Sequence, residues 1–564
     1  MTSGTIAFRE SPHPWGAAAR APDKTRKPRI WPVFLLVAAA QLAFGMWLNS
    51  LGYRLADALS RSGSALAVLW STDPHLAAIG FVWMPLPTLL ELPWAVLYPL
   101  WHDVVSSGFA STATTALCGG ATAAILVKTA SLLGLPTRLG WAFALLVSLN
   151  PMLLLYAGNG MSEGVAAPFL IGAVCLLTLF WRTGQRGYIA WAGLALAFGC
   201  ASLYQGVPFT LAVFGVMASV LVWGREAVRS APQGRWRAVQ GLGLLLLAPS
   251  AIVMLLWVVA NAAIMKDPLF FATSVYSNAA QTAVARQTPG GLPFIGQGDV
   301  GRTLAFCFVR TAALSVPVVA LLVVRGLDRR LQRVETLALV LLWSSVPLGF
   351  MAPLTYRGGS FGWLRFFIYP LLVAAGWGLY EVATSHRPRR AIAIILAGWV
   401  LASPVTLAAM ANPELGQEEH RMVQVLAGER HPQDLRRQDH VPAFKPMLSY
   451  LESEPLARGQ RILLDPATQA WPLVAQLEPQ HLRRLVVVTA DRQFAAAVAD
   501  PVRHNISYLL VPDPRLAQSD AINRLRPGLW EGRQPGFELE QKFPPRPRVS
   551  GGSGAFTKSN IDWP

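Results

Sequence analysis

An acidic motif, Ser-Thr-Asp-Pro-His at residues 71–75, lies between apolar stretches in the first long loop of the sequence, about residues 52–107. A charged side chain beside so much apolar sequence needs access to water or a neutralising partner. A carboxylate held at a membrane surface can take a proton from a hydroxyl nucleophile. We therefore expect Asp73 to be a general base. The competing interpretation is that Asp73 caps a following helix with Pro74 at its first position, and one residue could do both.

The elements that position this loop belong to a membrane protein. The chain has 564 residues, of which 53% are hydrophobic and only 14% charged, whereas soluble domains carry about 25% charged residues. Its mean hydropathy is +0.39. The formal net charge of +17 comes from Arg and Lys in short loops between apolar runs. That pattern is a topology signal, so we predict no nucleic-acid partner.

Apolar segments long enough for membrane-spanning helices recur through the first 411 residues. A bilayer core needs about 20 apolar residues in a helix. The eleven expected spans are about residues 31–50, 108–133, 139–157, 162–182, 188–204, 206–223, 238–264, 302–325, 336–354, 361–383 and 391–411. The segment at 85–101 contains four prolines and is expected to be an interfacial helix instead.

Loop charges predict the orientation. The end of the polar leader at 1–30 carries Lys24, Arg26, Lys27 and Arg29 just before the first span, and every further loop on the same predicted side contains arginine. Basic residues concentrate on the cytoplasmic side, so we place the N-terminus there and, after eleven spans, the C-terminus outside.

All four cysteines fall in predicted spans, which indicates neither a disulfide framework nor a metal site. The Ala/Arg-rich composition favours the inner (plasma) membrane of a bacterium.

The tail at 412–564 is polar and differs from the rest of the chain. A helical connector is expected at 418–427, and short β-rich runs at 461–464, 485–489 and 506–511 each end at a turn signal. Helical stretches are expected between these runs, near 471–477 and 494–499. Alternating strands and helices predict a small extracytoplasmic α/β domain with a parallel sheet. Its end, 544–554, is rich in Pro, Gly and Ser and is expected to be loose.

In arrangement, residues 30–410 resemble the integral-membrane glycosyltransferases of the GT-C fold, which include protein O-mannosyltransferases and lipid A aminoarabinose transferases. The likeness lies in Asp73 in a long first loop, followed by the Pro-Leu-Pro-Thr-Leu-Leu run at 85–90 and the span from 108. The outer turn at 150–163 and the Trp-Leu-Arg-Phe-Phe-Ile-Tyr-Pro stretch at 363–370 add to it. The chain departs from the commoner pattern in having Asp-Pro-His where many relatives have Asp-Glu.

The resemblance implies transfer of a sugar from a polyprenyl-phosphate or polyprenyl-diphosphate carrier to a hydroxyl of an outer-face lipid, glycan or protein acceptor, with Asp73 as the base. His75 could orient the acceptor, share its proton or ligate a divalent cation. Glu163 could hydrogen-bond sugar hydroxyls or act as a second carboxylate; otherwise it places a favourable charge at a helix N-terminus. Asp57 and Glu91 are lesser candidates and are expected to be solvated.

A phosphate leaving group needs cations on the outer side. Arg365 lies in an apolar stretch just after Tyr356 and Arg357, a costly depth for an unpaired arginine. We expect Arg365 to contact phosphate; the alternative is that its side chain snorkels to the surface. Lys266, Arg286 and Arg302 flank the loop at 266–301 and are weaker candidates for the same contact with phosphate. That loop contains Pro-Gly-Gly at 289–291, which suits a lid.

Two other function classes remain open. A transporter or flippase of a lipid-linked glycan would place charged groups at the membrane midplane, whereas the ionisable residues above fall at predicted outer ends. A non-catalytic envelope assembly protein would use its tail to bind partners and would tolerate loss of Asp73.

Overall fold

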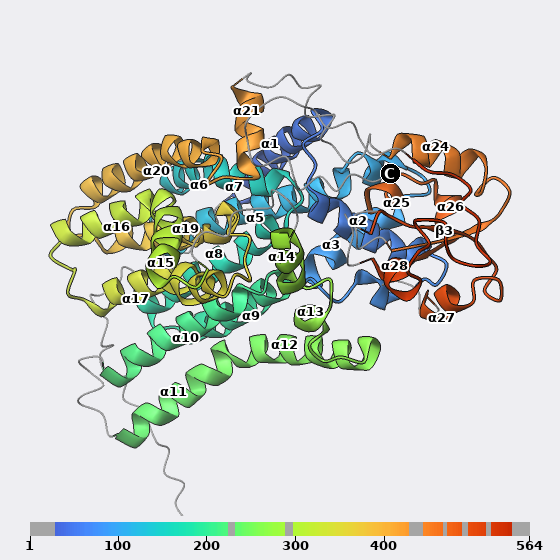
Figure 1. Cartoon of the computed structure of the whole chain (residues 1–564). Coiled ribbons are helices and arrows are strands. Elements are labelled where there is room, and N and C mark those ends of the chain that lie inside the picture. The colour runs from blue at the N-terminus through green and yellow to red at the C-terminus, as the bar shows by residue number, and fades with distance from the viewer. Residues whose placement is uncertain are drawn as a thin grey trace, which may run out of the picture.

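The chain forms a mainly helical structure in the computed structural model (Figure 1). The structure describes residues 29–223, 232–287, 297–427, 444–465, 471–487, 494–514 and 520–543. Nearly all of the expected leader at 1–30, the Pro-Gly-Gly of the expected lid and the expected loose end at 544–554 lie outside the described residues.

Long apolar helices build the larger part of the molecule. The principal helices are α1 (Trp31–Ser50), α5 (Phe109–Leu132), α6 (Thr137–Leu149), α7 (Pro151–Gly158), α8 (Ser162–Thr183), α9 (Gly187–Ser202), α10 (Gly206–Trp223), α11 (Pro232–Leu246), α12 (Ala248–Ala260), α15 (Val300–Ala313), α16 (Val316–Leu327), α17 (Val334–Ser345), α19 (Tyr369–Thr384) and α20 (Pro388–Ala411). Short turns η3 (Asn261–Met265), η4 (Pro347–Met351), α18 (Ala352–Tyr356) and η5 (Leu364–Phe367) extend or precede some of them. Each of the eleven predicted segments is helical over most of its length.

The number of spans differs from the predicted eleven. In the described parts of the chain, seven helical stretches are long and apolar enough to cross a membrane. The bent pairs α6–α7 and α15–α16, with angles of 74° and 77°, raise this number to nine if each pair is one span. Helix α9 and the apolar part of α10, 206–219, are shorter than the length required. The structure therefore supports a polytopic helical protein without confirming eleven spans.

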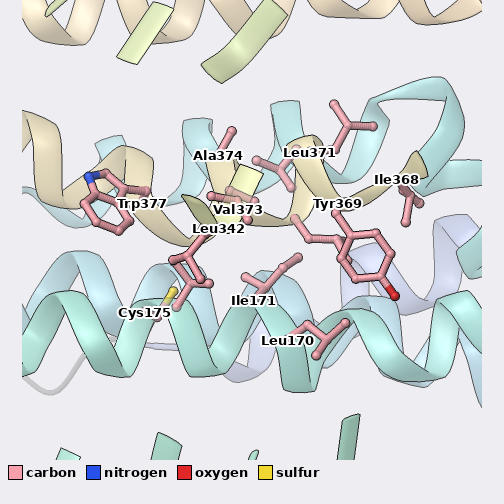
Figure 2. Packing of buried hydrophobic residues seen from close by; sticks show 14 of the residues in the cluster. Leu170, Ile171, Cys175, Leu342, Ile368, Tyr369, Leu371, Val373, Ala374 and Trp377 are labelled. Carbon is pink, nitrogen blue, oxygen red and sulfur yellow. The ribbon is translucent and has the colours of Figure 1, made fainter. Parts of the chain in front are cut away.

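Helices α8 and α19 form the centre of the bundle. Most of both helices is buried, and their side chains interlock (Figure 2). Leu170 and Ile171 of α8 lie on the side of α19 that carries Tyr369 and Val373, and all four belong to one continuous apolar core. A Cβ added at Gly376 would lie 2.5 Å from the Cβ of Val174. Glycine at this position is what allows the two helices to pack so closely.

The first loop folds into α2 (Ala56–Trp70), η1 (Leu76–Ile79), α3 (Leu86–Val96) and α4 (Asp103–Ser106). Helix α3 lies within the predicted interfacial segment, 85–101. It begins after Pro85 and has Pro87 in its first turn, positions where proline costs no helical hydrogen bond. The loop before α15 contains the short helices α13 (Phe270–Thr273) and α14 (Asn278–Gln287).

Three short strands follow the last long helix. The elements are α21 (Glu419–Leu426), α24 (Lys445–Ser453), β1 (Arg461–Leu464), α25 (Trp471–Val474), α26 (Pro479–Leu482), β2 (Leu485–Val487), α27 (Phe494–Ala499), β3 (Ile506–Leu510) and α28 (Ala521–Leu525). The strands pair in parallel in the order β2-β1-β3, with Ile462 beside Leu485 and Tyr508. The three strands and the connector helix form where the sequence predicts them.

The C-terminal segment packs directly against the first loop (Figure 1). Leu66, Tyr98 and Val105 from the loop share an apolar core with Ile462 and Leu482 near the sheet. The hydroxyl of Tyr98 also donates to the backbone carbonyl of Leu477. The separate domain at 412–564 therefore stays a prediction, because its described part shares a core with the loop that contains Asp73.

Candidate functional site

Arg365 is the centre of a buried group of opposite charges, which we call the Arg365 cluster. It comprises Arg365, Asp57, Glu163 and Glu418. Arg365 Nη2 lies 3.2 Å from Asp57 Oδ2, Nε lies 3.3 Å from Glu163 Oε1, and Nη1 donates to Glu418. The Arg365 side chain is 3% exposed, so these carboxylates compensate a cation that would otherwise be costly to bury. Because the cluster has three carboxylates for one arginine, its formal charge is negative.

Each member comes from a different part of the chain. Asp57 is in the first turn of α2, Glu163 is in the first turn of α8, and Arg365 belongs to the 3-10 turn before α19. A Cβ added at Gly164 would lie 2.2 Å from the carbonyl oxygen of Tyr156 on α7. This glycine therefore lets the start of α8 approach α7 and brings Glu163 to Arg365.

The connector after the last long helix supplies the third carboxylate. Glu418 pairs with Arg365, and its backbone carbonyl accepts a hydrogen bond from the Tyr53 hydroxyl at 3.1 Å. The next residue, Glu419, is fully buried and accepts from the Tyr156 hydroxyl at 2.6 Å. Burial raises the pKa of Glu418 from 4.5 to about 8, although Arg365 opposes this, and burial also raises the pKa of Glu419. The connector thus adds two protonatable acids beside the site.

A second buried cation, Arg61, lies one turn further along α2 from Asp57. Its side chain donates to the backbone carbonyl of Asp57 at 3.3 Å and to Ser162 Oγ at 3.2 Å, and its guanidinium lies 5.2 Å from the Trp83 ring centroid. In the described chain its hydrogen bonds all go to neutral groups. Burial lowers the pKa of Arg61. A buried cation with neutral partners is suited to binding an anion.

A small recess opens beside Arg365 and Glu163. It is a narrow recess between the start of α8, the break between α9 and α10, and the start of α19. Gln205 and Tyr369 add polar groups to its wall, and most of the remaining lining is apolar. The site therefore combines a carboxylate cluster, a cation whose hydrogen bonds within the described chain go to neutral groups, and a partly polar recess.

The predicted base and its histidine neighbour lie elsewhere. Asp73 follows the other end of α2, and fifteen helical residues separate the two ends by about 22 Å. Thr72 next to it donates to the backbone carbonyl of Arg483 at 3.1 Å, so this end of α2 touches the C-terminal segment. His75 Nδ1 is 3.9 Å from Asp73 Oδ2. The short helix starts at Leu76 with His75 as its N-cap, so the expectation that Asp73 caps it with Pro74 at its first position is wrong.

Four other predicted residues are exposed and are not members of the Arg365 cluster. Tyr356 is 42% exposed at the end of α18, and Arg357 follows it. Lys266 Nζ donates to the Ala263 carbonyl at 2.8 Å at the end of η3. Arg302, in the first turn of α15, forms an exposed ion pair with Asp299 at 3.5 Å. Of the predicted site residues, the structure therefore places Glu163 and Arg365 in the Arg365 cluster, while Asp73 and His75 lie beside each other at the far end of α2.

Two residues that were expected to be solvated instead contact other side chains inside the protein. Asp57 pairs with Arg365 and keeps 32% of its side chain exposed. Glu91 is buried on α3, where it accepts from Ser62, and burial raises its pKa from 4.5 to about 8. Sequence reasoning also missed Arg61, whose signal was a lone arginine inside an Ala/Ser/Leu-rich segment at 58–69. Within the described residues, no group of three or more His, Cys, Asp or Glu side chains is arranged to hold a metal ion.

Comparison with known proteins gives one structural similarity to report. No protein-family model and no curated protein matches the sequence. The fold is similar to the crystal structure of ArnT from Cupriavidus metallidurans bound to undecaprenyl phosphate, with a TM-score of 0.46 and 15% identity. The match covers 85% of this chain and 89% of that chain. We base the proposals below on this chain's own contacts.

Proposed function

We propose that this chain is an integral-membrane glycosyltransferase that moves a sugar from a polyprenyl-phosphate carrier to a hydroxyl of an extracytoplasmic lipid, glycan or protein. The observation that supports this function best is the Arg365 cluster beside the buried cation Arg61. It offers carboxylates for hydroxyl groups and a cation for phosphate within one buried region. We place the site at the outer face of the plasma membrane, with the N-terminus in the cytoplasm.

Asp57 is the base that we favour. Its carboxylate is held by Arg365 at one oxygen and is partly exposed, so an acceptor hydroxyl can approach it. As the acceptor oxygen attacks the anomeric carbon, the hydroxyl proton passes to the carboxylate. The bond between that carbon and the phosphate oxygen breaks, and the phosphate leaves with the electron pair. Asp73 remains the second candidate, with His75 beside it, and would place acceptor chemistry at the junction with the C-terminal segment.

Arg61 is the cation that we assign to the leaving phosphate. The predicted phosphate contact, Arg365, is already paired with Asp57 and Glu163, whose negative charges would repel a phosphate, and also with Glu418. Arg61 has hydrogen bonds to neutral groups and feels a longer-range attraction from Asp57, Glu163 and Glu91. An anion at Arg61 would be stabilised in surroundings from which water is mostly excluded. Arg365 then serves mainly to hold Asp57 and Glu163 in place.

A flippase is the second candidate, because a second group of buried charges lies at the opposite end of α19. There, Arg325 and Arg330 pair with Glu381. A flippase that opens alternately to the two sides of the membrane needs a gate at each side, and the two ends of α19 are where these charged groups lie.

The test is donor turnover by purified protein in liposomes, using undecaprenyl phosphate linked to glucose, galactose, mannose or arabinose. We expect release of undecaprenyl phosphate that depends on an added hydroxyl acceptor. Movement of a fluorescent lipid-linked sugar across the liposome membrane, without any release of sugar, would contradict transfer and favour the flippase. Neither activity with any of these lipids would count against both functions and favour the assembly protein.

A further inference from the structure

Arg310, on α15, is a buried arginine that is held by backbone carbonyls. It is 3% exposed, its Nε donates to the Gly362 carbonyl at 2.9 Å, and its Nη2 donates to the Glu414 carbonyl. Its guanidinium lies 3.5 Å from the centroid of the Phe306 ring, one turn earlier on the same helix. Neither hydrogen-bond acceptor is a carboxylate. Because a cation without an opposite charge is costly to bury, Arg310 requires a reason that packing does not supply.

The two carbonyls belong to the two chain segments that meet in the Arg365 cluster. Gly362 is three residues before Arg365, in the turn that leads into η5. Glu414 is four residues before Glu418, in the connector that leads into α21. Arg365 and Glu418 then pair with each other. Arg310 therefore holds both segments just before the point where each contributes a side chain to the cluster.

The turn at Gly362 is shaped for this contact with α15. Gly362 has a φ of +67°, and a Cβ added to it would lie 2.4 Å from Phe306 Cζ. Glycine is the residue that tolerates both the left-handed conformation and the close approach. The Gly362 N–H donates to Ser360 Oγ at 3.0 Å, and the ring centroid of Trp363 lies 4.1 Å from the Arg365 guanidinium. The turn therefore closes on α15 and delivers Arg365 to its carboxylates.

Arginine suits a bridge between two segments. Nε and one Nη group of a planar guanidinium can donate to two acceptors at once, whereas the ammonium of lysine is a single point charge. Among the described residues, the buried Nε of Arg61 lacks a hydrogen-bond partner, but no buried nitrogen of Arg310 does. Arg61 thus has a donor to offer a ligand, while the donors of Arg310 are already used by the protein.

We propose that Arg310 is a positioning residue that holds the turn before Arg365 and the connector before Glu418 where the Arg365 cluster can form. This inference rests on the proposed function, in which Arg365 holds the base Asp57 for the acceptor hydroxyl. Arg310 acts through Arg365 and takes no part in proton transfer. Its loss should slow sugar transfer and leave binding of the donor phosphate unchanged.

Amide hydrogen exchange, measured by mass spectrometry in lipid nanodiscs, tests the positioning without any substrate. Arg310→Met replaces the cation by an apolar side chain and should raise exchange in peptides covering 360–368 and 412–420 about tenfold, as for loss of one hydrogen bond to each segment. Arg310→Lys keeps the charge but should not restore wild-type exchange in both segments. Wild-type exchange in both peptides of Arg310→Met would overturn the proposal.

Glu381→Ala is the matched control, because it breaks a buried arginine pair at the opposite end of α19. It should lower the melting temperature and leave exchange in 360–368 and 412–420 at the wild-type level. Equal increases in Glu381→Ala and Arg310→Met would show that any loss of stability loosens these segments, and would overturn a specific role for Arg310.

Sugar transfer in liposomes tests the consequence for the reaction. Arg310→Met should lower kcat about tenfold to a hundredfold, as for a small misplacement of a reacting group, with unchanged affinity for undecaprenyl phosphate. Weaker binding of undecaprenyl phosphate with unchanged kcat would make Arg310 a phosphate contact and overturn the proposal. Full activity in Arg310→Lys would show that only the charge matters, and would overturn it as well.

The two measurements separate this proposal from the proposed function. Raised exchange in Arg310→Met without transfer by wild type would support the positioning and contradict the transferase. Raised exchange with wild-type kcat would overturn a role in the reaction and leave the transferase standing. If Arg310→Met does not fold, Gly362→Ala decides, because its added Cβ should push the turn away from Phe306 and produce the same pattern. Wild-type exchange and kcat in Gly362→Ala would overturn the proposal.

Discussion

The two ends of α19 bury arginines in different ways. At the start of the helix, Arg365 faces Asp57, Glu163 and Glu418, and two of these carboxylates are 32% and 20% exposed. At the other end is the Arg325 cluster, which we define as Arg325, Arg330, Asp328, Glu335 and Glu381. All five of its side chains are 10% exposed or less. Both ends bury charge, but only the first leaves part of it accessible.

The charge balance of the two clusters also differs. In the Arg325 cluster, two cations face three carboxylates, and Glu381 is shared by Arg325 and by Arg330 at 2.8 Å. Trp377 Nε1 also donates to Glu381 at 2.8 Å, and Arg330 donates to Thr384 at 2.9 Å. The Arg365 cluster has one cation for three carboxylates and borders the recess. Buried charge alone is therefore a poor sign of function. An excess of carboxylates over arginines at the edge of a recess is a better sign of function.

Breaking the Arg325 cluster should have the largest effect on stability. Glu381→Ala leaves two buried arginines with less compensation and should lower the free energy of unfolding by about 3–5 kcal/mol. We expect a large fall in melting temperature in detergent, with sugar transfer by the remaining folded protein unchanged. Glu418→Gln is the comparison at the other end and should cost much less. Similar losses in both variants would contradict a structural role confined to one end of α19.

Arg61 should affect lipid binding more than stability. Arg61→Gln removes the proposed phosphate contact and should weaken binding of undecaprenyl phosphate roughly tenfold to a hundredfold, as expected for a charged hydrogen bond. Binding in nanodiscs measures this directly. The matched control is Arg458→Gln, which changes an arginine that is 65% exposed in the C-terminal segment and paired with Glu454. Equal affinity of wild type and Arg61→Gln for undecaprenyl phosphate would show that the phosphate does not bind at Arg61.

Glu418 should make stability depend on pH. Because burial raises its pKa from 4.5 to about 8 in the folded state, protonation of Glu418 favours folding. This contribution is present below about pH 4.5 and is lost as the pH rises through about 8. The melting temperature of wild type should therefore fall over this range, and the fall should be smaller in Glu418→Gln. Parallel profiles for the two proteins would show that another group is responsible.

Local patterns in the sequence predicted much of the fold. Apolar length located the helices, and β-rich runs ending in turns located β1, β2 and β3. The depth of Arg365 in an apolar stretch indicated that an unpaired arginine would be costly there, and the structure pairs it with carboxylates, whereas the expected phosphate contact stays a prediction. These features depend on residues near one another in the chain, where periodicity and composition are informative.

The candidate site could not be predicted in the same way, because its residues are far apart in the sequence and meet only in the folded chain. Asp57 and Arg365 are 308 residues apart, and Thr72 contacts a backbone carbonyl 411 residues away. Glu418 was expected only as part of a connector, because nothing near it in the sequence shows that the connector returns to Arg365. Asp73 stood out for its motif, while Asp57 gave no local signal beyond a charge at a helix start.

Sugar transfer by Asp57→Asn and Asp73→Asn, compared with wild type in liposomes, tests the central claim most directly. A general base contributes about a hundredfold to ten-thousandfold, so Asp57→Asn should lose at least that lower factor while still binding the donor. Asp73→Asn should keep most of the wild-type rate. Loss of transfer in Asp73→Asn with near-normal transfer in Asp57→Asn would contradict a reaction at the Arg365 cluster and place the base at the far end of α2.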